Sequence, residues 1–174
     1  MKFAYADPPY PGCGHRYKEK TEVDHAELIQ HLTGNYSDGW ALSTSSTALQ
    51  SVIALCPSDC RVAAWVKPFA VFKPNVNPAY AWEPVIFRGG RRGDRTRLTV
   101  RDWHSESITL RRGLVGVKPP GFNRWITMLL GMAEGDTLDD IYPGSNGMAT
   151  ERQQRVLSLR HGRVEAPCDV KETK

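Results

Sequence analysis

Residues 2–10 of the chain read KFAYADPPY. The first five, Lys2 to Ala6, are predicted to form a short strand, because the Pro-Pro pair that follows cannot continue a hydrogen-bonded ladder. The four residues 7–10 then form a turn at the carboxyl end of that strand. Ligands bind beyond the carboxyl ends of strands in open sheets that are mainly parallel. The turn is therefore the first candidate site.

The composition of this turn suits the binding of an amino group attached to an aromatic ring. The lone pair of such an amine is delocalised into the ring, and accepting hydrogen bonds from both amine hydrogens makes it more available. The Asp7 carboxylate can accept one bond and the Pro8 carbonyl the other, while the fixed φ of proline keeps the turn rigid. Tyr10 can stack on a base that has left its strand. The catalytic candidates are Asp7, Pro8, Pro9 and Tyr10.

The rest of the chain alternates predicted strands and helices. Strands are expected at 40–44, 61–66, 83–87 and 137–142, with strand-like pieces at 97–101 and 107–110. Pro84 predicts that its strand lies at a sheet edge or begins there. Helices are expected at 23–32, with Asp24 as N-cap, and at 46–55, 122–132 and 148–159. This alternation favours a three-layer α/β domain with a mostly parallel sheet.

Two further segments add to the first turn. Residues 135–147 read GDTLDDIYPGSNG, so the last predicted strand runs into a glycine-containing loop at the same sheet edge as Asp7. A glycine there lets backbone approach a ligand closely, and the N-terminus of a following helix offers N–H groups to an anion. Lys118-Pro119-Pro120 precedes the helix expected at 122–132. Two loops at one edge suit a transferase with two substrates.

These three segments resemble the catalytic, cofactor and Lys-Pro elements of S-adenosylmethionine-dependent amino-methyltransferases of the Asp-Pro-Pro-Tyr type. Their order, with the catalytic turn first and the cofactor loop last, is similar to that of the circularly permuted members. These include one class of small bacterial and phage DNA methyltransferases and the family of the mRNA adenosine methyltransferases. Residues 65–68 (WVKP) and 82–87 (WEPVIF) resemble the middle strands of the latter. The expected fold is a circularly permuted, Rossmann-like methyltransferase fold, and the small size is typical of a phage enzyme.

The resemblance implies S-adenosylmethionine as cofactor, no metal, and methyl transfer to N6 of adenine in DNA. RNA or cytosine N4 are alternative acceptors, and a catalytically inactive nucleic-acid-binding protein on the same scaffold is the alternative from another class. The residues implied to bind the cofactor are Asp7, Lys118, Pro119, Asp140, Tyr142, Gly144, Ser145 and Gly147.

The sequence also departs from the family's pattern. Asn146 stands inside the glycine loop, although Asn tolerates a positive φ better than other residues with a side chain. No apolar strand is predicted after residue 152, so the domain is expected at 1–162 with strands missing and a disordered tail at 163–174. Sheet edge exposed by missing strands is a surface for a second copy, which makes a homodimer one expected arrangement.

The chain has 174 residues and a net charge of +4, a size that fits one domain. The segment 88–112 holds eight arginines against three acidic residues. It is interpreted as a basic insertion, either for phosphate contacts or as a solvated surface loop. The candidates for nucleic-acid contact are Arg88, Arg91, Arg92, Arg95, Arg97 and Arg101.

The composition also excludes some settings. No apolar run is long enough to span a membrane, and the N-terminus lacks the apolar stretch of a signal peptide. The four cysteines show no disulfide spacing, which favours a reduced, cytoplasmic setting, the host cytoplasm for a phage enzyme.

Overall fold

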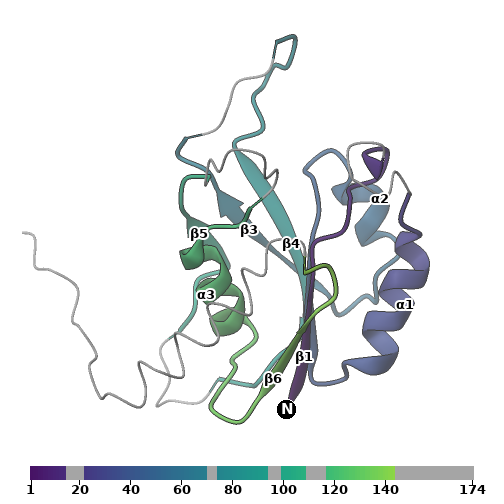
Figure 1. Ribbon diagram of the computed structural model, residues 1–174, viewed down its shortest axis with the longest axis vertical. Coiled ribbons are helices and arrows are strands. Elements are labelled where there is room, and N and C mark those ends of the chain that lie inside the picture. The colour runs from purple at the N-terminus through teal and green to yellow at the C-terminus, as the bar shows by residue number, and fades with distance from the viewer. Residues whose placement is uncertain (15–21, 70–73, 94–98, 109–116, 144–174) are drawn as a thin grey trace, which may run out of the picture.

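The computed structural model describes residues 1–14, 22–69, 74–93, 99–108 and 117–143 (Figure 1). Within them, nine elements follow one another along the chain. They are β1 (Lys2–Ala6), α1 (His25–Asn35), β2 (Gly39–Ser43), α2 (Leu49–Ile53), β3 (Arg61–Val66), β4 (Trp82–Gly89), β5 (Trp103–Ser105), α3 (Pro120–Leu129) and β6 (Thr137–Asp140).

The strands form one sheet in the order β5-β3-β4-β2-β1-β6. β1 is parallel to both β2 and β6, and β3 is parallel to β5, whereas β4 is antiparallel to its two neighbours. All strands except β4 therefore run in one direction, and their carboxyl ends meet at one edge. The mostly parallel sheet predicted from the sequence is confirmed.

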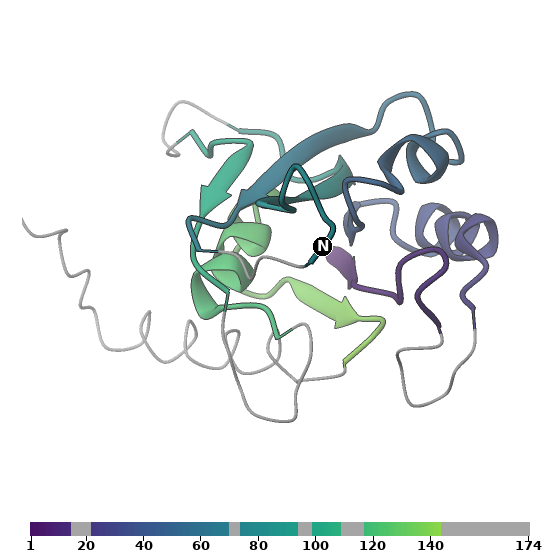
Figure 2. The same cartoon turned by 90° about the horizontal axis from the view of Figure 1, so that it is seen from above.

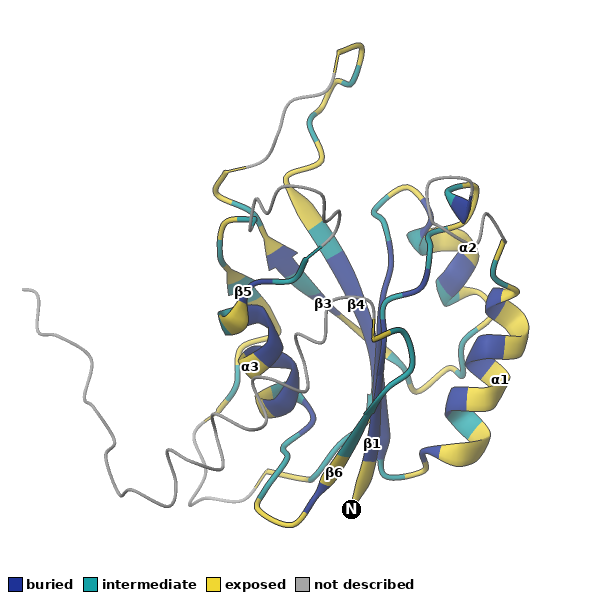
Figure 3. Cartoon of the chain, in the orientation of Figure 1, coloured by how far each residue is buried: buried dark blue, intermediate teal, exposed yellow. Residues whose placement is uncertain are grey.

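Helices cover both faces of this sheet. α1 and α2 lie on one face and α3 on the other, as the two views in Figures 1 and 2 show. Each helix turns its apolar side to the sheet, and the inner strands β1 and β2 are buried along nearly their whole length (Figure 3). Successive residues of these strands belong to the cores on opposite faces. The result is the predicted three-layer α/β architecture, with one hydrophobic core on each side of the sheet.

Local sequence explains most of the element boundaries. The Asp24 carboxylate caps α1 as predicted, accepting from the N–H groups of Ala26 and Glu27 at 2.9 and 3.0 Å. α1 continues through Gly34 to Asn35, past the predicted end at residue 32. α2 is shorter than expected, since it spans only Leu49–Ile53.

The expectation that Pro84 places its strand at a sheet edge, or begins it, is wrong. β4 lies between β2 and β3, and Pro84 is its third residue. The backbone N–H of Thr44 donates to the Pro84 carbonyl (3.1 Å) just beyond the last residue of β2. The missing N–H of the proline points toward the same place, where β2 has ended. An interior strand therefore accommodates a proline at the cost of one bond at the end of a ladder.

The strand-like pieces predicted at 97–101 and 107–110 are also wrong in the residues that the structure describes, because 99–101 and 107–108 form no strand. The outer strand is β5, and it lies between them because its residues pair with β3 from Ala64 to Val66. The glycine loop at 144–147, the helix expected at 148–159 and the tail at 163–174 lie outside the described residues. In the described part of the chain, no helix has the length and apolar character needed to span a membrane.

Candidate active site at the carboxyl edge of the sheet

The carboxyl ends of the parallel strands bring together residues from distant parts of the sequence. β1 and β6 are neighbours, and the Ile141 N–H donates to the Tyr5 carbonyl at 2.9 Å. The turn after β1 and residues 141–143 after β6 therefore leave the sheet at the same edge, and the glycine loop at 144–147 follows directly in the sequence. β4 begins at this edge because it runs the opposite way. Its second residue, Glu83, therefore lies at the carboxyl edge of the parallel strands.

Asp7 lies at this edge after β1, the neighbour of the outer strand β6. It follows β1 directly, with 22% of its side chain exposed, and the next residue, Pro8, is fully buried. One carboxylate oxygen, Oδ1, lies 3.0 Å from the ammonium of Lys118. The ion pair fixes the carboxylate, and its second oxygen, Oδ2, remains for another partner.

Lys118 connects Asp7 to Glu83. Only 9% of its side chain is exposed, and its Nζ lies 3.0 Å from Glu83 Oε2. A third, longer contact of 3.4 Å joins Nζ to the hydroxyl of Tyr10. The ammonium is therefore held by two carboxylates and a phenol in a site with little access to water.

Glu83, like Lys118, binds several of these groups. Its Oε2 also accepts a hydrogen bond from the Tyr10 hydroxyl (3.0 Å), and its Oε1 is bound by the ammonium of Lys67. Lys67 follows β3 and is 10% exposed. Two carboxylates and two ammonium groups thus alternate, so the buried charges compensate one another.

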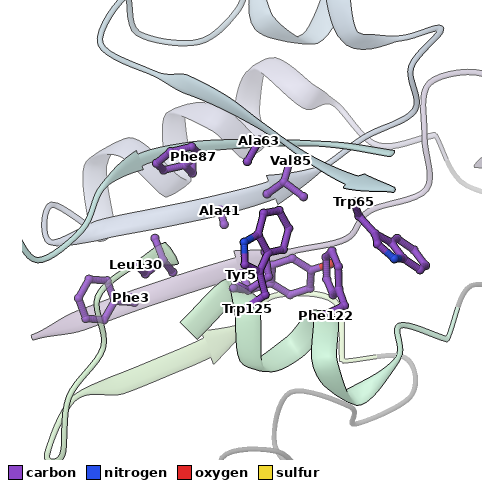
Figure 4. Close-up of a cluster of buried hydrophobic side chains, with 11 residues drawn as sticks. Phe3, Tyr5, Ala41, Ala63, Trp65, Val85, Phe87, Phe122, Trp125 and Leu130 are labelled. Carbon is purple, nitrogen blue, oxygen red and sulfur yellow. The ribbon is translucent and has the colours of Figure 1, made fainter. Parts of the chain in front are cut away.

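Aromatic rings form the wall behind Lys118. Its ammonium lies 5.5 Å from the ring centre of Trp65, 5.8 Å from that of Phe122 and 5.9 Å from that of Tyr10. In the core between the sheet and α3, the ring centre of Phe122 lies 5.1 Å from that of Trp65 and 6.1 Å from that of Tyr5 (Figure 4). The ring faces attract the cation and exclude water from it.

The surroundings shift the pKa values of the three central groups. Burial raises the pKa of Asp7 and outweighs the opposing charge of Lys118. Burial alone would lower the pKa of Lys118, but the charges of Asp7 and Glu83 raise it well above its ordinary value. Burial would raise the pKa of Glu83, but Lys118 and Lys67 lower it. Lys118 and Glu83 therefore stay charged near neutral pH.

Tyr5 and Ser43, near the carboxyl ends of β1 and β2, form a hydrogen bond next to the site. The Tyr5 hydroxyl and Ser43 Oγ, from neighbouring strands β1 and β2, are 2.8 Å apart and buried. Burial and the nearby charge of Asp7 raise the pKa of Tyr5 well above its ordinary value. The phenol therefore stays neutral and anchors the end of β1 to β2.

Asp140 and Tyr142 lie on the side of the β6 loop. Asp140 Oδ1 accepts a hydrogen bond from the Tyr142 N–H at 3.2 Å. Burial raises the pKa of Asp140, and the charge of Asp7 adds to this. The two carboxylates are thus close enough to repel each other. The other loop residues expected at the cofactor, Gly144, Ser145 and Gly147, lie outside the described residues.

The structure brings Lys118 and Pro119 to the catalytic turn. The contacts of Lys118 are Asp7, Glu83 and Tyr10, and Pro119 occupies the N-cap position of α3. The sequence had placed both residues with the cofactor. Glu83 and Lys67 were not among the predicted site residues. One signal pointed to Glu83: the two-residue period of β4 sets it on the same face as the buried Val85 and Phe87.

Two of the arginines predicted to contact nucleic acid are held in ion pairs within the fold. Arg88 is ion-paired with Asp59 (2.7 Å), and Arg91 with Asp136 (2.7 Å). Asp59 precedes β3 and Asp136 precedes β6, so both pairs lie at the amino ends of the parallel strands. That edge is opposite to Asp7, and these two guanidinium groups stabilise the fold there.

The other predicted arginines are less constrained. The guanidinium of Arg101 lies 5.3 Å from the ring centre of Trp103, and both side chains are exposed. Arg92 is also exposed. Arg95 and Arg97 lie outside the described residues.

Comparison with known proteins supports the fold at the level of structure. No family of known proteins matches the sequence, and no curated protein is similar to it. Among solved structures, the chain is similar to the crystal structure of the M1.HpyAVI–SAM complex, with a TM-score of 0.58 and 14% sequence identity. The match covers 88% of this chain and 78% of that chain. This likeness confirms the predicted Rossmann-like α/β fold.

Proposed function

We propose that this protein transfers the methyl group of S-adenosylmethionine to an exocyclic amino group of a nucleic-acid base, with N6 of adenine in DNA as the acceptor. The observation that carries the proposal is the Asp7 carboxylate, held by Lys118 at the carboxyl end of β1. It lies directly beside the loop that follows β6. The crystal structure of a protein with this fold in complex with SAM supports the choice of cofactor.

The turn after β1 prepares the amine. Lys118 occupies Asp7 Oδ1, so the other carboxylate oxygen accepts one amine hydrogen, and the Pro8 carbonyl accepts the second. Both hydrogen bonds favour an amine geometry in which the nitrogen lone pair is less delocalised into the ring and is available to attack the methyl group. Tyr10, whose hydroxyl is fixed by Glu83, stacks on the base and holds it at the edge. Positioning of this kind supplies much of the catalysis in a displacement reaction.

The residues on the cofactor side fit a cationic ligand. S-adenosylmethionine supplies a methyl group on a positively charged sulfonium when it is bound. Asp7 and Asp140 follow or end neighbouring strands, and burial, together with the charge of Asp7, raises the pKa of Asp140. A cationic ligand bound near both carboxylates would favour their ionised forms. Asp140, Tyr142 and the loop residues Gly144, Ser145 and Gly147 would hold the cofactor, beside the amine held by Asp7.

We assign contacts with the nucleic-acid backbone to the arginines of segment 88–112. Exposed guanidinium groups suit phosphate oxygens, so the exposed Arg92 and Arg101 are the first candidates, and Arg95 and Arg97 stay candidates from the sequence. Arg88 and Arg91 would have to exchange a carboxylate partner for a phosphate. A homodimer also stays a prediction.

The test is methylation of unmethylated duplex DNA with tritiated S-adenosylmethionine. We expect incorporation by the wild type, loss of about 100-fold or more in Asp7→Ala, which removes a group that acts in the transition state, and nearly full activity in Asp59→Ala. Asp59 is the matched control because it is an aspartate at the opposite edge of the sheet. Digestion to nucleosides distinguishes N6-methyladenine from N4-methylcytosine, and RNA is assayed in parallel.

Two outcomes would contradict the proposal. One is the absence of incorporation into any of these substrates by the wild type. The other is equal activity of the wild type and Asp7→Ala. Calorimetric titration with S-adenosylmethionine then separates the alternatives, because a nucleic-acid-binding protein that has lost the cofactor gives no heat with it.

A further inference from the structure

The ammonium of Lys118 lies directly beside the carboxylate that is to hold the amine. The distance from Nζ to Asp7 Oδ1 is 3.0 Å. The pair presents a hydrogen-bond acceptor next to a donor, both at the carboxyl edge of the sheet. A ligand that meets Asp7 with a donor therefore meets Lys118 with the neighbouring atom.

Adenine presents the matching pattern on its Watson–Crick edge. The exocyclic amine is a donor, and the ring nitrogen N1 beside it is an acceptor. Enzymes that act on a base taken out of the stack read it through this edge. We propose that Lys118 donates a hydrogen bond to the ring nitrogen adjacent to the target amine, so that Asp7 and Lys118 together read the base. This inference rests on the proposed function.

The surroundings of Lys118 allow this role. An ammonium has three N–H donors, and the three contacts of Nζ are Asp7, Glu83 and, at 3.4 Å, the Tyr10 hydroxyl. The contact with Tyr10 is the longest and costs least to exchange for a ring nitrogen. Glu83 and Asp7 keep hold of the ammonium during the exchange. With 9% of the side chain exposed, a new partner faces little competition from water.

The donor and acceptor pair also determines which bases are rejected. Guanine and thymine carry a carbonyl oxygen where adenine has its amine, and an N–H where adenine has N1. Each would place an oxygen against the Asp7 carboxylate and an N–H against the ammonium of Lys118, leaving buried groups unpaired. Cytosine has the same order as adenine, so this pair accepts either base, and the choice between them belongs to other contacts.

The test uses base analogues at the adenine that the wild type methylates. In 1-deazaadenine the N1 acceptor is replaced by C–H, whereas 7-deazaadenine keeps N1 and loses a nitrogen on the other ring. For the wild type we expect kcat/KM to fall roughly 10- to 100-fold on 1-deazaadenine relative to 7-deazaadenine, the range for a lost charged hydrogen bond. In Lys118→Met the ratio between the two analogues should be smaller by that factor. Comparing ratios between enzymes cancels the intrinsic reactivity of each amine.

Two variants control for indirect effects. Lys67→Met removes the second ammonium group that binds Glu83. Lys67 belongs to the same network, but it contacts Glu83 Oε1 and does not contact Asp7. The variant should keep the wild-type ratio even where its overall rate falls. Lys118→Arg retains charged N–H donors and should retain part of the discrimination. The wild-type measurement alone tests the inference if Lys118→Met does not fold.

The outcomes separate this inference from the proposed function. Equal rates of the wild type on the two analogues, or equal ratios in the wild type and a folded Lys118→Met, would overturn the role of Lys118 while methylation of adenine stands. A wild type that methylates no base overturns the proposed function, and the inference with it.

Discussion

At the scale of single residues, the site depends on charges that compensate one another while they are partly buried. Asp7, Lys118, Glu83 and Lys67 alternate in sign. Removing any one of them takes an ion-pair partner from at least one buried charge, and removing Lys118 takes it from both Asp7 and Glu83. Substitutions here therefore change the protonation of the neighbours as well as the contact that is removed.

The pH dependence of the reaction should report the pKa of Asp7. Asp7 accepts the amine hydrogen only when ionised, and burial raises its pKa above the ordinary 3.8. We expect kcat/KM to fall as the pH falls through that raised pKa. Lys118→Met removes the charge that opposes the shift, so the acid limb should move to higher pH. Rates of methylation measured from acid to neutral pH give both profiles, and an acid limb that moves to lower pH in Lys118→Met would refute the assignment.

Tyr10 offers a second test at this scale, because its ring and its hydroxyl have separate roles. The ring is assigned to stacking, and the hydroxyl donates to Glu83 at 3.0 Å. Tyr10→Ala should raise KM for DNA by roughly 5- to 150-fold, since a stacked base contributes about 1–3 kcal/mol. Tyr10→Phe should keep most of that affinity. The dissociation constant for S-adenosylmethionine, measured by calorimetry, serves as the control and should change little in either variant.

At the scale of elements, α3 depends on a distant carboxylate for its N-terminal cap. Pro119 occupies the N-cap position and offers no side-chain acceptor. Glu106, which follows β5, accepts instead from the N–H groups of Phe122 (2.8 Å) and Gly121 (3.3 Å). A negative group at a helix N-terminus is favourable. This contact also holds the start of α3 next to Lys118.

The same contact explains why residue 121 is glycine. A Cβ there would lie 2.5 Å from Glu106 Oε2, so Gly121→Ala should displace the carboxylate and destabilise the protein by about 1 kcal/mol, the usual value of a lost cap. In a Glu106→Ala background the clash is gone. Gly121→Ala should then be neutral or stabilising by about 0.5–1 kcal/mol, because alanine favours a helix over glycine. Urea unfolding of the four proteins completes the cycle, and equal effects of Gly121→Ala in both backgrounds would contradict the cap.

Helices and strands were predicted correctly from the sequence where local residue types determine them, and incorrectly where pairing with another strand does. The strand before Asp7 and the cap at Asp24 were predictable because local residue types determine them. Pro84 misled the prediction because its effect depends on where the neighbouring strand β2 ends. β5 was misplaced because a three-residue edge strand is determined by its pairing with β3. Such pairing is a tertiary property that local preference does not carry.

At the scale of the whole molecule, the two edges of the sheet have different roles. The carboxyl edge brings the predicted Asp7, Tyr10 and Lys118 together. The strand before Asp7 was enough to place Asp7 and Tyr10 in one site, whereas Lys118 had been assigned to the cofactor by resemblance. The partners Glu83 and Lys67 could not be assigned in the same way, because their contacts arise from the antiparallel insertion of β4. The amino edge holds two of the arginines whose charge had suggested phosphate binding, Arg88 and Arg91. Composition showed the charge, whereas only the fold shows that Asp59 and Asp136 pair with these two.

The ion pair between Arg91 and Asp136 should control acid stability from that amino edge. Burial alone would raise the pKa of Asp136, but hydrogen bonds from the α-amino group of Met1 and from Arg91 lower it well below 3.8. A carboxyl group with a lowered pKa contributes stability above its unfolded pKa and loses it as the pH falls through the folded value. Arg91→Met leaves a carboxylate that is 4% exposed with fewer partners, and should cost about 1–3 kcal/mol at pH 7.

That deficit should shrink once the pH falls below the folded-state pKa of Asp136 in the variant, which is higher than in the wild type, because Asp136 becomes protonated first in the variant and then in the wild type. Urea unfolding at pH 7, 4 and 3 measures it, with Arg92→Met as the control because Arg92 is the exposed neighbour in sequence. A deficit that is independent of pH would mean that Arg91 acts through packing of its side chain alone. Because this edge lies opposite to Asp7, the variant should retain methyl transfer at neutral pH while it remains folded, which separates stability of the sheet from chemistry at its other edge.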